Sequence, residues 1–191
     1  MSAMHGHSLL IEFLDSNPNI EGKTLIEIGT TRESLPGQDS SSYFYNISKE
    51  RGINFTTVDM DPENTERIKN RFPGINAICS KGEDFIESFA GVIDYLYIDA
   101  FDFFHNNHST KRYEAYQKNL NTTINDSACH KMHLDCAVNC IEKMSKGGII
   151  VIDDCFGVNF ERGKGVTAIP FLIDNGFKVI KRNSQAVALQ R

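Results

Sequence analysis

Three aspartates end two apolar runs of the sequence. Asp99 closes the run 95–99, and Asp153 with Asp154 closes the run 149–154. Because the strands of an open parallel α/β sheet end at one ligand-binding edge, we expect these carboxylates to lie together there. Carboxylate oxygens bind Mg²⁺, and a hydroxyl bound to Mg²⁺ loses its proton more easily. The sequence therefore predicts a magnesium site that activates a substrate hydroxyl.

A second group of residues is typical of nucleoside binding. Gly29 ends the predicted strand 24–29, where it permits a tight turn and close approach of a ligand to the backbone. Asp59 ends the predicted strand 55–59, where a carboxylate can accept hydrogen bonds from both hydroxyls of a ribose. Residues 30–32 stand where dinucleotide-binding proteins carry further glycines, which argues against a dinucleotide site.

The elements that position these residues alternate along the chain. Strands are predicted at 24–29, 55–59, 75–79, 92–99, 149–154, 177–181 and 186–189. Helices are predicted at about 9–14, 40–51, 62–71, 84–89 and 129–144, with another that ends near 175. Mostly apolar strands that alternate with helices indicate a parallel sheet covered on both faces. The predicted fold is α/β: a Rossmann-like three-layer sandwich with a seven-stranded, mostly parallel sheet and an antiparallel last strand.

Composition limits the class of protein. The 191 residues, 40% of them hydrophobic, suffice for one domain over 1–191. A net charge of -5 without a basic run argues against a nucleic-acid partner. No apolar stretch approaches the roughly 20 residues of a membrane span, and residues 1–8 lack the pattern of a signal peptide. We therefore expect a cytoplasmic protein that acts on a small molecule, away from membranes.

The cysteines are expected to be reduced and mostly buried, because their number is odd. Cys129, His133, Cys136 and Cys140 fall at helical spacing, so a zinc site is an alternative to a core stripe. Residues along one straight helix cannot surround a metal, which favours the core stripe. The first helix and the apolar segment 169–173 could pack in a homodimer.

The polar segment 100–127 is too long for a simple connection and is predicted to be a substrate loop or lid. We predict His105 as the general base because it lies just beyond Asp99 and has an ordinary pKa near neutrality. Other candidates for the base are Asp102, His108, His130 and His133. The side chains of Phe101, Phe103 and Phe104 could form a wall of an acceptor pocket.

Five short motifs, in this order, resemble the class I S-adenosylmethionine-dependent methyltransferases. They lie at 25–29, 57–62, 81–85, 97–99 and 147–154. The resemblance implies that Gly29 and the loop after it meet the methionine end of the cofactor, that Asp59 meets the ribose, and that Gly82 and Glu83 meet the ribose and adenine. The full set of cofactor-binding residues that it implies is Glu27, Gly29, Thr30, Ser41, Asp59, Met60, Gly82, Glu83 and Asp99.

The three acids resemble the ligands of metal-dependent branches, such as catechol O-methyltransferase and the sugar O-methyltransferases related to macrocin O-methyltransferase. The resemblance implies Asp99, Asp153 and Asp154 as Mg²⁺ ligands, with Asp99 also in a catalytic role. The Asp-Asp pair is closer to the sugar-modifying branch. Asp102 stands where the catechol enzymes carry a lysine, which leaves the base open. The alternative for Asp153 or Asp154 is a turn cap.

The sequence thus predicts an S-adenosylmethionine-dependent, Mg²⁺-assisted O-methyltransferase that modifies a hydroxyl of a small polar molecule, such as a sugar or a glycosylated metabolite. One alternative is a metal-independent small-molecule methyltransferase, whose activity would survive a chelator. A second is a protein that binds S-adenosylmethionine or a nucleotide without catalysis. A third is an NAD-linked oxidoreductase, which would bind NAD and not S-adenosylhomocysteine.

Overall fold

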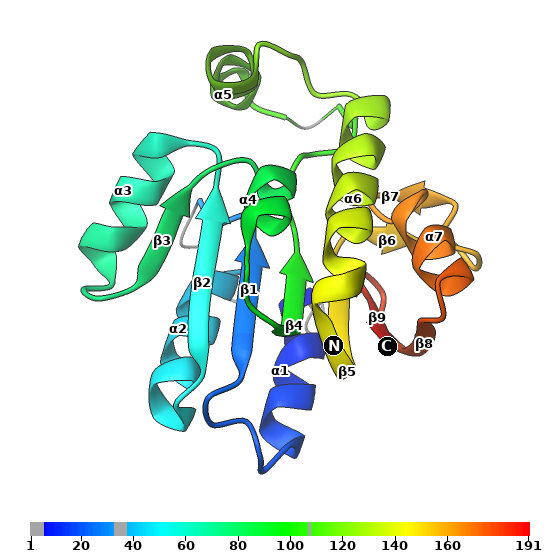
Figure 1. Cartoon of the computed structure of the whole chain (residues 1–191). Coiled ribbons are helices and arrows are strands. Elements are labelled where there is room, and N and C mark those ends of the chain that lie inside the picture. Colours follow the sequence, from blue (N-terminus) through cyan, green and yellow to red (C-terminus); the bar gives the residue numbers. More distant parts are fainter. Residues whose placement is uncertain (1–5, 33–37, 107) are drawn as a thin grey trace.

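A seven-stranded sheet in the order β3-β2-β1-β4-β5-β9-β8 forms the centre of the molecule (Figure 1). The computed structural model describes residues 6–32, 38–106 and 108–191. The strands of this sheet are β1 (Thr24–Ile28), β2 (Asn54–Asp59), β3 (Asn76–Cys79), β4 (Ile93–Ile98), β5 (Met144–Ile152), β8 (Lys178–Arg182) and β9 (Val187–Gln190). Strand β9 runs antiparallel to β5 and β8, and the other pairs are parallel. The predicted α/β fold is confirmed.

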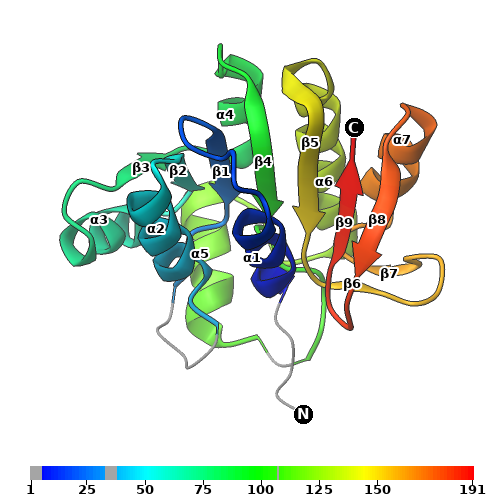
Figure 2. The ribbon, with the colours of Figure 1, turned by 90° about the horizontal axis from the view of Figure 1, so that it is seen from below.

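Helices cover both faces of the sheet, as the view from below shows (Figure 2). One face carries α1 (Gly6–Ser16), α2 (Ser40–Arg51) and α3 (Pro62–Arg71). The other face carries α4 (Gly82–Ser88), α6 (Asp126–Cys140) and α7 (Ala168–Asp174). None of the helices within the described ranges is long and apolar enough to cross a membrane.

The sheet separates two apolar cores because successive residues of a strand point to opposite faces. In β4, Leu96 and Ile98 belong to the core that includes residues of α4, α6 and α7. Tyr95 and Tyr97 belong to the core that includes residues of α1 and α2. Two successive residues at the end of a strand can therefore contact different groups. This applies to the acids that follow β4 and β5.

The segments considered for a dimer face supply residues to these cores. Leu9, Leu10 and Leu14 of α1 are fully buried within the chain, as are Ile169 and Leu172 of α7. The cysteines of α6 behave in the same way. Cys129, Cys136 and Cys140 are fully buried free thiols, and Cys136, Ala137 and Cys140 lie in the core as predicted for the helical stripe, whereas Met144, also predicted in that stripe, begins β5.

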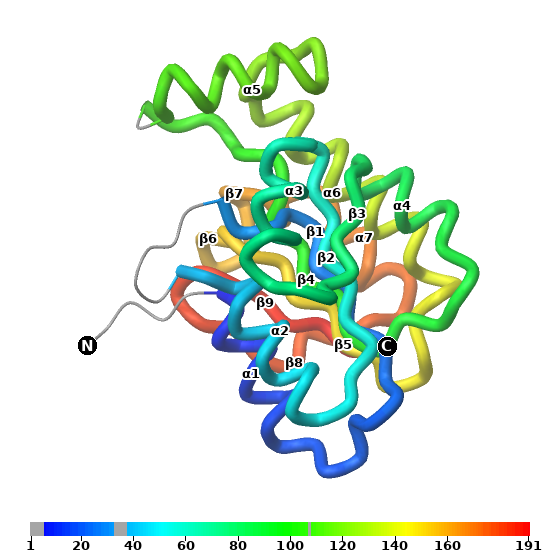
Figure 3. Tube along the Cα trace, turned by 90° about the vertical axis from the view of Figure 1, so that its left-hand side faces the viewer, coloured from blue at the N-terminus to red at the C-terminus, as the bar shows by residue number. Residues whose placement is uncertain are grey.

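Residues 100–127 contain a helix that we did not predict, α5 (Thr110–Leu120), which begins after the N-cap Ser109. Figures 1 and 3 show α5 beyond the ends of the strands, apart from the layers that cover the sheet. Its few apolar side chains, Tyr113, Tyr116 and Leu120, stand at helical spacing, but the polar composition concealed the pattern. A short hairpin, β6 (Cys155–Phe156) with β7 (Arg162–Gly163), was also not predicted.

The C-terminal end of α4 is held by Lys143, in the 3-10 turn Ile141–Lys143 after α6. The Lys143 ammonium donates hydrogen bonds to the carbonyl oxygens of Ile86 at 2.6 Å, Glu87 at 2.5 Å and Phe89 at 2.8 Å. Carbonyls in the last turn of a helix lack partners within the helix, and a cation there also suits the helix dipole. This contact ties α4 to the chain that enters β5.

Replacing Lys143 with Met should therefore lower the free energy of unfolding by about 1–3 kcal/mol, because three carbonyl acceptors lose a charged donor. Urea unfolding measures the loss. Lys146→Met, at an exposed position of β5, is the matched control and should change stability by less than about 0.5 kcal/mol. Equal stability of the two variants would contradict the capping role.

Candidate functional site

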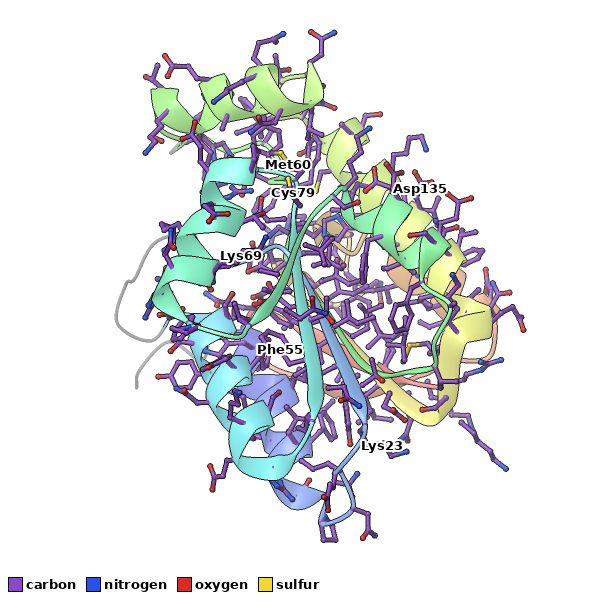
Figure 4. All side chains as sticks on the ribbon, turned by 60° about the vertical axis from the view of Figure 1, so that its left-hand side comes forward. Lys23, Phe55, Met60, Lys69, Cys79 and Asp135 are labelled. Atoms are coloured by element: carbon purple, nitrogen blue, oxygen red, sulfur yellow. The ribbon has the colours of Figure 1, made fainter. Side chains whose placement is uncertain are left out.

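A pocket of about 440 Å³ lies at the carboxyl ends of β1 and β2, between the start of α4 and helix α5. Five of the predicted cofactor residues line it: Gly29, Asp59, Met60, Gly82 and Glu83. Figure 4 shows Met60 at the end of β2 nearest α5, with Lys23 at the opposite end of the sheet. The predicted carboxyl ends of β1 and β2 therefore do meet at one pocket, as expected for an open α/β sheet.

Two glycines allow the backbone to pack closely beneath this pocket. Gly29 has a φ of +99°, and a Cβ there would lie 2.2 Å from the carbonyl oxygen of Asp99. A Cβ on Gly82 would lie 2.2 Å from a side-chain methyl of Ile28. Any larger residue would force the end of β1 away from β4 or from α4, so both glycines shape the floor of the pocket.

Asp59 is 4% exposed and holds the turn between β2 and α3. Its Oδ1 accepts a hydrogen bond from the Asp61 backbone N–H at 2.8 Å, and its Oδ2 accepts one from Asn64 Nδ2 at 2.7 Å. Burial raises the pKa of the Asp59 carboxyl, while the nearby Arg32 guanidinium and these two hydrogen bonds act in the opposite direction. Each carboxylate oxygen can accept a second hydrogen bond, so the group can still bind a ribose hydroxyl.

Three other predicted cofactor residues lie in an internal polar cluster, which we define as Glu27, Thr30, Ser40, Ser41 and Thr57. The Glu27 carboxylate is fully buried and accepts hydrogen bonds from Ser40 at 2.6 Å, Ser41 at 2.7 Å and Thr57 at 2.6 Å. The Thr30 and Thr57 hydroxyl oxygens are 2.6 Å apart. The lining of the pocket does not include Glu27, Thr30 or Ser41. Their contacts connect β1 and β2 to α2.

Helix α5 forms part of the pocket wall. Tyr116 and Leu120 line the pocket, and Phe101 packs edge-on against Tyr116 with ring centroids 4.8 Å apart. The Tyr116 hydroxyl donates to Asp102 Oδ2 at 3.0 Å, and Arg112 Nε lies 2.8 Å from the same oxygen. Asp102 therefore anchors α5 to the chain that leaves β4.

His105, the predicted general base, is not among the residues that line the pocket. Its ring stacks on the ring of His108 with centroids 3.6 Å apart. Burial, and to a smaller extent His108, lower the pKa of His105. The structure therefore places His105 on the loop after β4, outside the pocket wall to which Phe101 belongs.

The three predicted metal ligands have different partners in the structure. Asp153 is 8% exposed, and its carboxylate accepts hydrogen bonds from the Tyr97 hydroxyl and, at 2.8 Å, from the Asp154 backbone N–H. Asp99 and Asp154 instead share the ammonium of Lys164, which contacts Asp99 Oδ1 and lies 3.0 Å from Asp154 Oδ2. Burial raises the pKa of Asp153 to about 7, with a further contribution from Asp99 and Asp154.

These contacts do not support the predicted Mg²⁺ cluster of Asp99, Asp153 and Asp154. Over residues 6–32, 38–106 and 108–191, no group of three or more His, Cys, Asp or Glu side chains is arranged to hold a metal. One physical reason is that successive residues at a strand end point in different directions, which sends Asp153 to Tyr97. The other is that a cation, Lys164, already lies between the remaining two carboxylates. The residues present do not fit a magnesium ion.

Two basic residues of this region were not among the predicted site residues. Arg32 lines the pocket, with Nη1 3.5 Å from Asp102 Oδ2, but we considered it only as a departure from a glycine motif. Burial would lower the pKa of Lys164, yet the carboxylates of Asp154 and Asp99 raise it well above its usual range, so Lys164 is a cation. The available signal was the Gly-Lys-Gly sequence at 163–165, soon after the Asp-Asp pair.

No protein-family model and no curated protein matches the sequence. Among solved structures, the N-methyltransferase NodS from Bradyrhizobium japonicum WM9 in complex with S-adenosyl-L-homocysteine has a TM-score of 0.57 at 15% identity, covering 97% of this chain and 85% of that chain. A TehB-like S-adenosylmethionine-dependent methyltransferase from Corynebacterium glutamicum has a TM-score of 0.55 at 13% identity, with 98% and 87% covered.

NSun6 from Pyrococcus horikoshii has a TM-score of 0.63 at 10% identity, over 97% of this chain and 51% of that chain. Identities this low carry information about the fold and not about the reaction. The comparisons therefore show that the chain has the fold of class I S-adenosylmethionine-dependent methyltransferases.

Replacing Glu27 with Gln should change how stability depends on pH. Burial raises the pKa of Glu27 from 4.5 to about 7, against the opposing hydrogen bonds from Ser40, Thr57 and Ser41. As the pH rises, the unfolded chain therefore ionises first, and stability that is fully present below pH 4.5 is lost up to about pH 7. The loss amounts to about 2–3 kcal/mol.

Urea unfolding of the wild type and Glu27→Gln at pH 5 and pH 8 tests this expectation. From pH 5 to pH 8, the free energy of unfolding of the wild type should fall by about 2–3 kcal/mol more than that of the variant, because Gln does not ionise. Asp153 titrates in both proteins, so its contribution cancels in the difference. Glu66→Gln, at an exposed position of α3, is the control and should follow the wild type. A Glu27→Gln curve parallel to that of the wild type would contradict the assignment.

Proposed function

We propose that the protein is an S-adenosylmethionine-dependent methyltransferase that acts on a small molecule. The observation that carries the proposal is the pocket that brings together Gly29, Asp59, Met60, Gly82 and Glu83 at the carboxyl ends of β1 and β2. A pocket at that place in an α/β sheet is where ligands of this architecture bind. NodS, which has the same fold, was crystallised with S-adenosyl-L-homocysteine, the product of the cofactor.

Each pocket residue has a specific contact in this proposal. Asp59 accepts hydrogen bonds from the ribose hydroxyls, and the apolar side chain of Met60 packs against the adenine. Gly82 and Glu83, at the start of α4, approach the ribose and adenine from the other side of the pocket. The turn at Gly29 borders the methionine end of the cofactor. When bound, the cofactor supplies an electrophilic methyl group that an acceptor atom attacks as the bond to sulfur breaks.

We propose a small polar acceptor with a hydroxyl group, since α5 and Phe101 enclose one side of the pocket and Asp99 directly precedes Ala100, which lines it. Asp99 and Asp154 have side chains 33% and 35% exposed, so their outer oxygens can accept a hydrogen bond from a hydroxyl. Holding the acceptor oxygen in line with the methyl group is a large part of catalysis for such a transfer. Because Lys164 lies between these acids, the metal-independent form of the reaction is favoured over the Mg²⁺-assisted form.

Replacing Asp59 with Ala should weaken binding of S-adenosylhomocysteine roughly 10- to 100-fold, because hydrogen bonds from ribose to a charged acceptor are lost. Isothermal titration calorimetry measures the affinity. Asp94→Ala is the matched control, since Asp94 is a partly buried aspartate at the opposite end of the sheet that binds Lys23 and the Thr24 backbone N–H. It should leave the affinity unchanged.

Asp59 also supports the turn before α3, so circular dichroism of each variant accompanies the titration, and Asp59→Asn replaces Asp59→Ala if the latter does not fold. Equal affinity in the Asp59 and Asp94 variants would contradict the pocket assignment. Binding of NAD without binding of S-adenosylhomocysteine would instead indicate an oxidoreductase. Cofactor binding without consumption of S-adenosylmethionine over a panel of polyols and sugars would indicate a binding protein.

A further inference from the structure

The most unusual side chain near the pocket is Lys164, which is 3% exposed. Its ammonium contacts Asp99 Oδ1 and lies 3.0 Å from Asp154 Oδ2, so it bridges the strand ends of β4 and β5. Burying a cation costs several kcal/mol unless charged partners compensate it. The cation is buried, while the side chains of the two aspartates that hold it are about a third exposed.

The backbone around Lys164 is built to bring it there. Gly163 has a φ of +89°, and a Cβ on it would lie 1.8 Å from the carbonyl oxygen of Asp154. This close approach lets the Lys164 backbone N–H donate to that same carbonyl at 2.9 Å. A Cβ on Gly165 would lie 2.6 Å from Cys155 Sγ and 2.4 Å from a methyl of Ile169. Gly163 therefore has no room for a side chain, and a side chain at 165 would have to displace Cys155 or Ile169.

Helix α6 and the hairpin fix this segment from two further directions. His130 Nε2 lies 2.9 Å from the Gly163 carbonyl oxygen, and the Thr167 hydroxyl donates to the His130 carbonyl at 2.8 Å. In the hairpin, Cys155 pairs with Gly163. Asp154 itself has a φ of +50°, a conformation that costs free energy for a residue other than glycine. The surroundings thus hold both Lys164 and its partner Asp154 in defined positions.

We propose that Lys164 is a positioning residue that provides the cation of the acidic site and so takes the place of a divalent metal. The proposal rests on the methyltransferase function above and adds to it the reason that this site needs no metal. Mg²⁺ requires carboxylate oxygens at about 2.0–2.1 Å in octahedral geometry. In this chain those oxygens of Asp99 and Asp154 face an ammonium, which repels a second cation. With its charge neutralised in part, the pair can hold an acceptor hydroxyl in a fixed direction.

Removal of Lys164 should therefore create a binding site for a divalent cation that the wild type lacks. The probe is Mn²⁺, whose free fraction is measured by electron paramagnetic resonance. Lys164→Ala should bind Mn²⁺ at least roughly tenfold more tightly than the wild type and Lys146→Ala, the exposed control. Lys164→Arg keeps the cation and should bind no more Mn²⁺ than the wild type. The double variant Lys164→Ala/Asp154→Asn should lose the gain, because one ligand is gone.

Two results would overturn the proposal. One is Mn²⁺ binding by the wild type that Asp154→Asn abolishes. The other is a folded Lys164→Ala with no gain in Mn²⁺ affinity, checked with Lys164→Met as a second variant. If neither Lys164 variant folds, Mn²⁺ binding by the wild type is the test. The absence of binding up to about 1 mM Mn²⁺ supports the proposal. Binding by the wild type below that concentration, lost in Asp154→Asn, refutes it. Calorimetry with S-adenosylhomocysteine on the wild type tests the methyltransferase function separately, since Lys164 is not among the pocket-lining residues.

Discussion

The arrangement of the site depends on one buried charge interaction, between the Lys164 ammonium and the carboxylates of Asp99 and Asp154. Two carboxylates at adjacent strand ends repel each other, and burial makes that repulsion stronger. A cation between them removes most of the cost. The strand ends of β4 and β5 can therefore carry two neighbouring acids, because the chain supplies the compensating charge from Lys164, directly after β7.

A second set of close contacts positions the pocket itself. The missing side chain of Gly29 allows β1 to end against the Asp99 carbonyl, and that of Gly82 allows α4 to begin against Ile28. On the other face of the sheet, the Glu27 carboxylate binds three hydroxyl groups and holds the start of α2 against β1 and β2. The pocket floor is thus rigid on both sides, while α5 joins it mainly through Asp102 and Tyr116. Rigid support of this kind suits precise placement of a ligand.

Much of this molecule follows from local patterns in the sequence. The order and class of most strands and helices, the two-sided sheet and the antiparallel last strand were predicted from apolar runs, caps and turn residues, because those signals act over a few residues. Gly29 and Asp59 were placed together for a related reason: parallel strands deliver their carboxyl ends to one edge. Met60, Gly82 and Glu83 were implied by the resemblance to the methyltransferases, and they line the same pocket. Helix α5 was not predicted, since its polar composition hides a weak apolar period.

The contacts of each acid, however, were decided by the tertiary structure. The sequence established that Asp99, Asp153 and Asp154 end two apolar strands, but nothing local in it states that Tyr97 binds Asp153 or that Lys164 returns to meet the other two. Likewise, Glu27 and Ser41 bind each other, Thr30 binds Thr57, and none of the three predicted cofactor residues lines the pocket. The physical reason is that hydrogen bonds and ion pairs join atoms from distant segments. Their partners are known only when the backbone has brought those segments together.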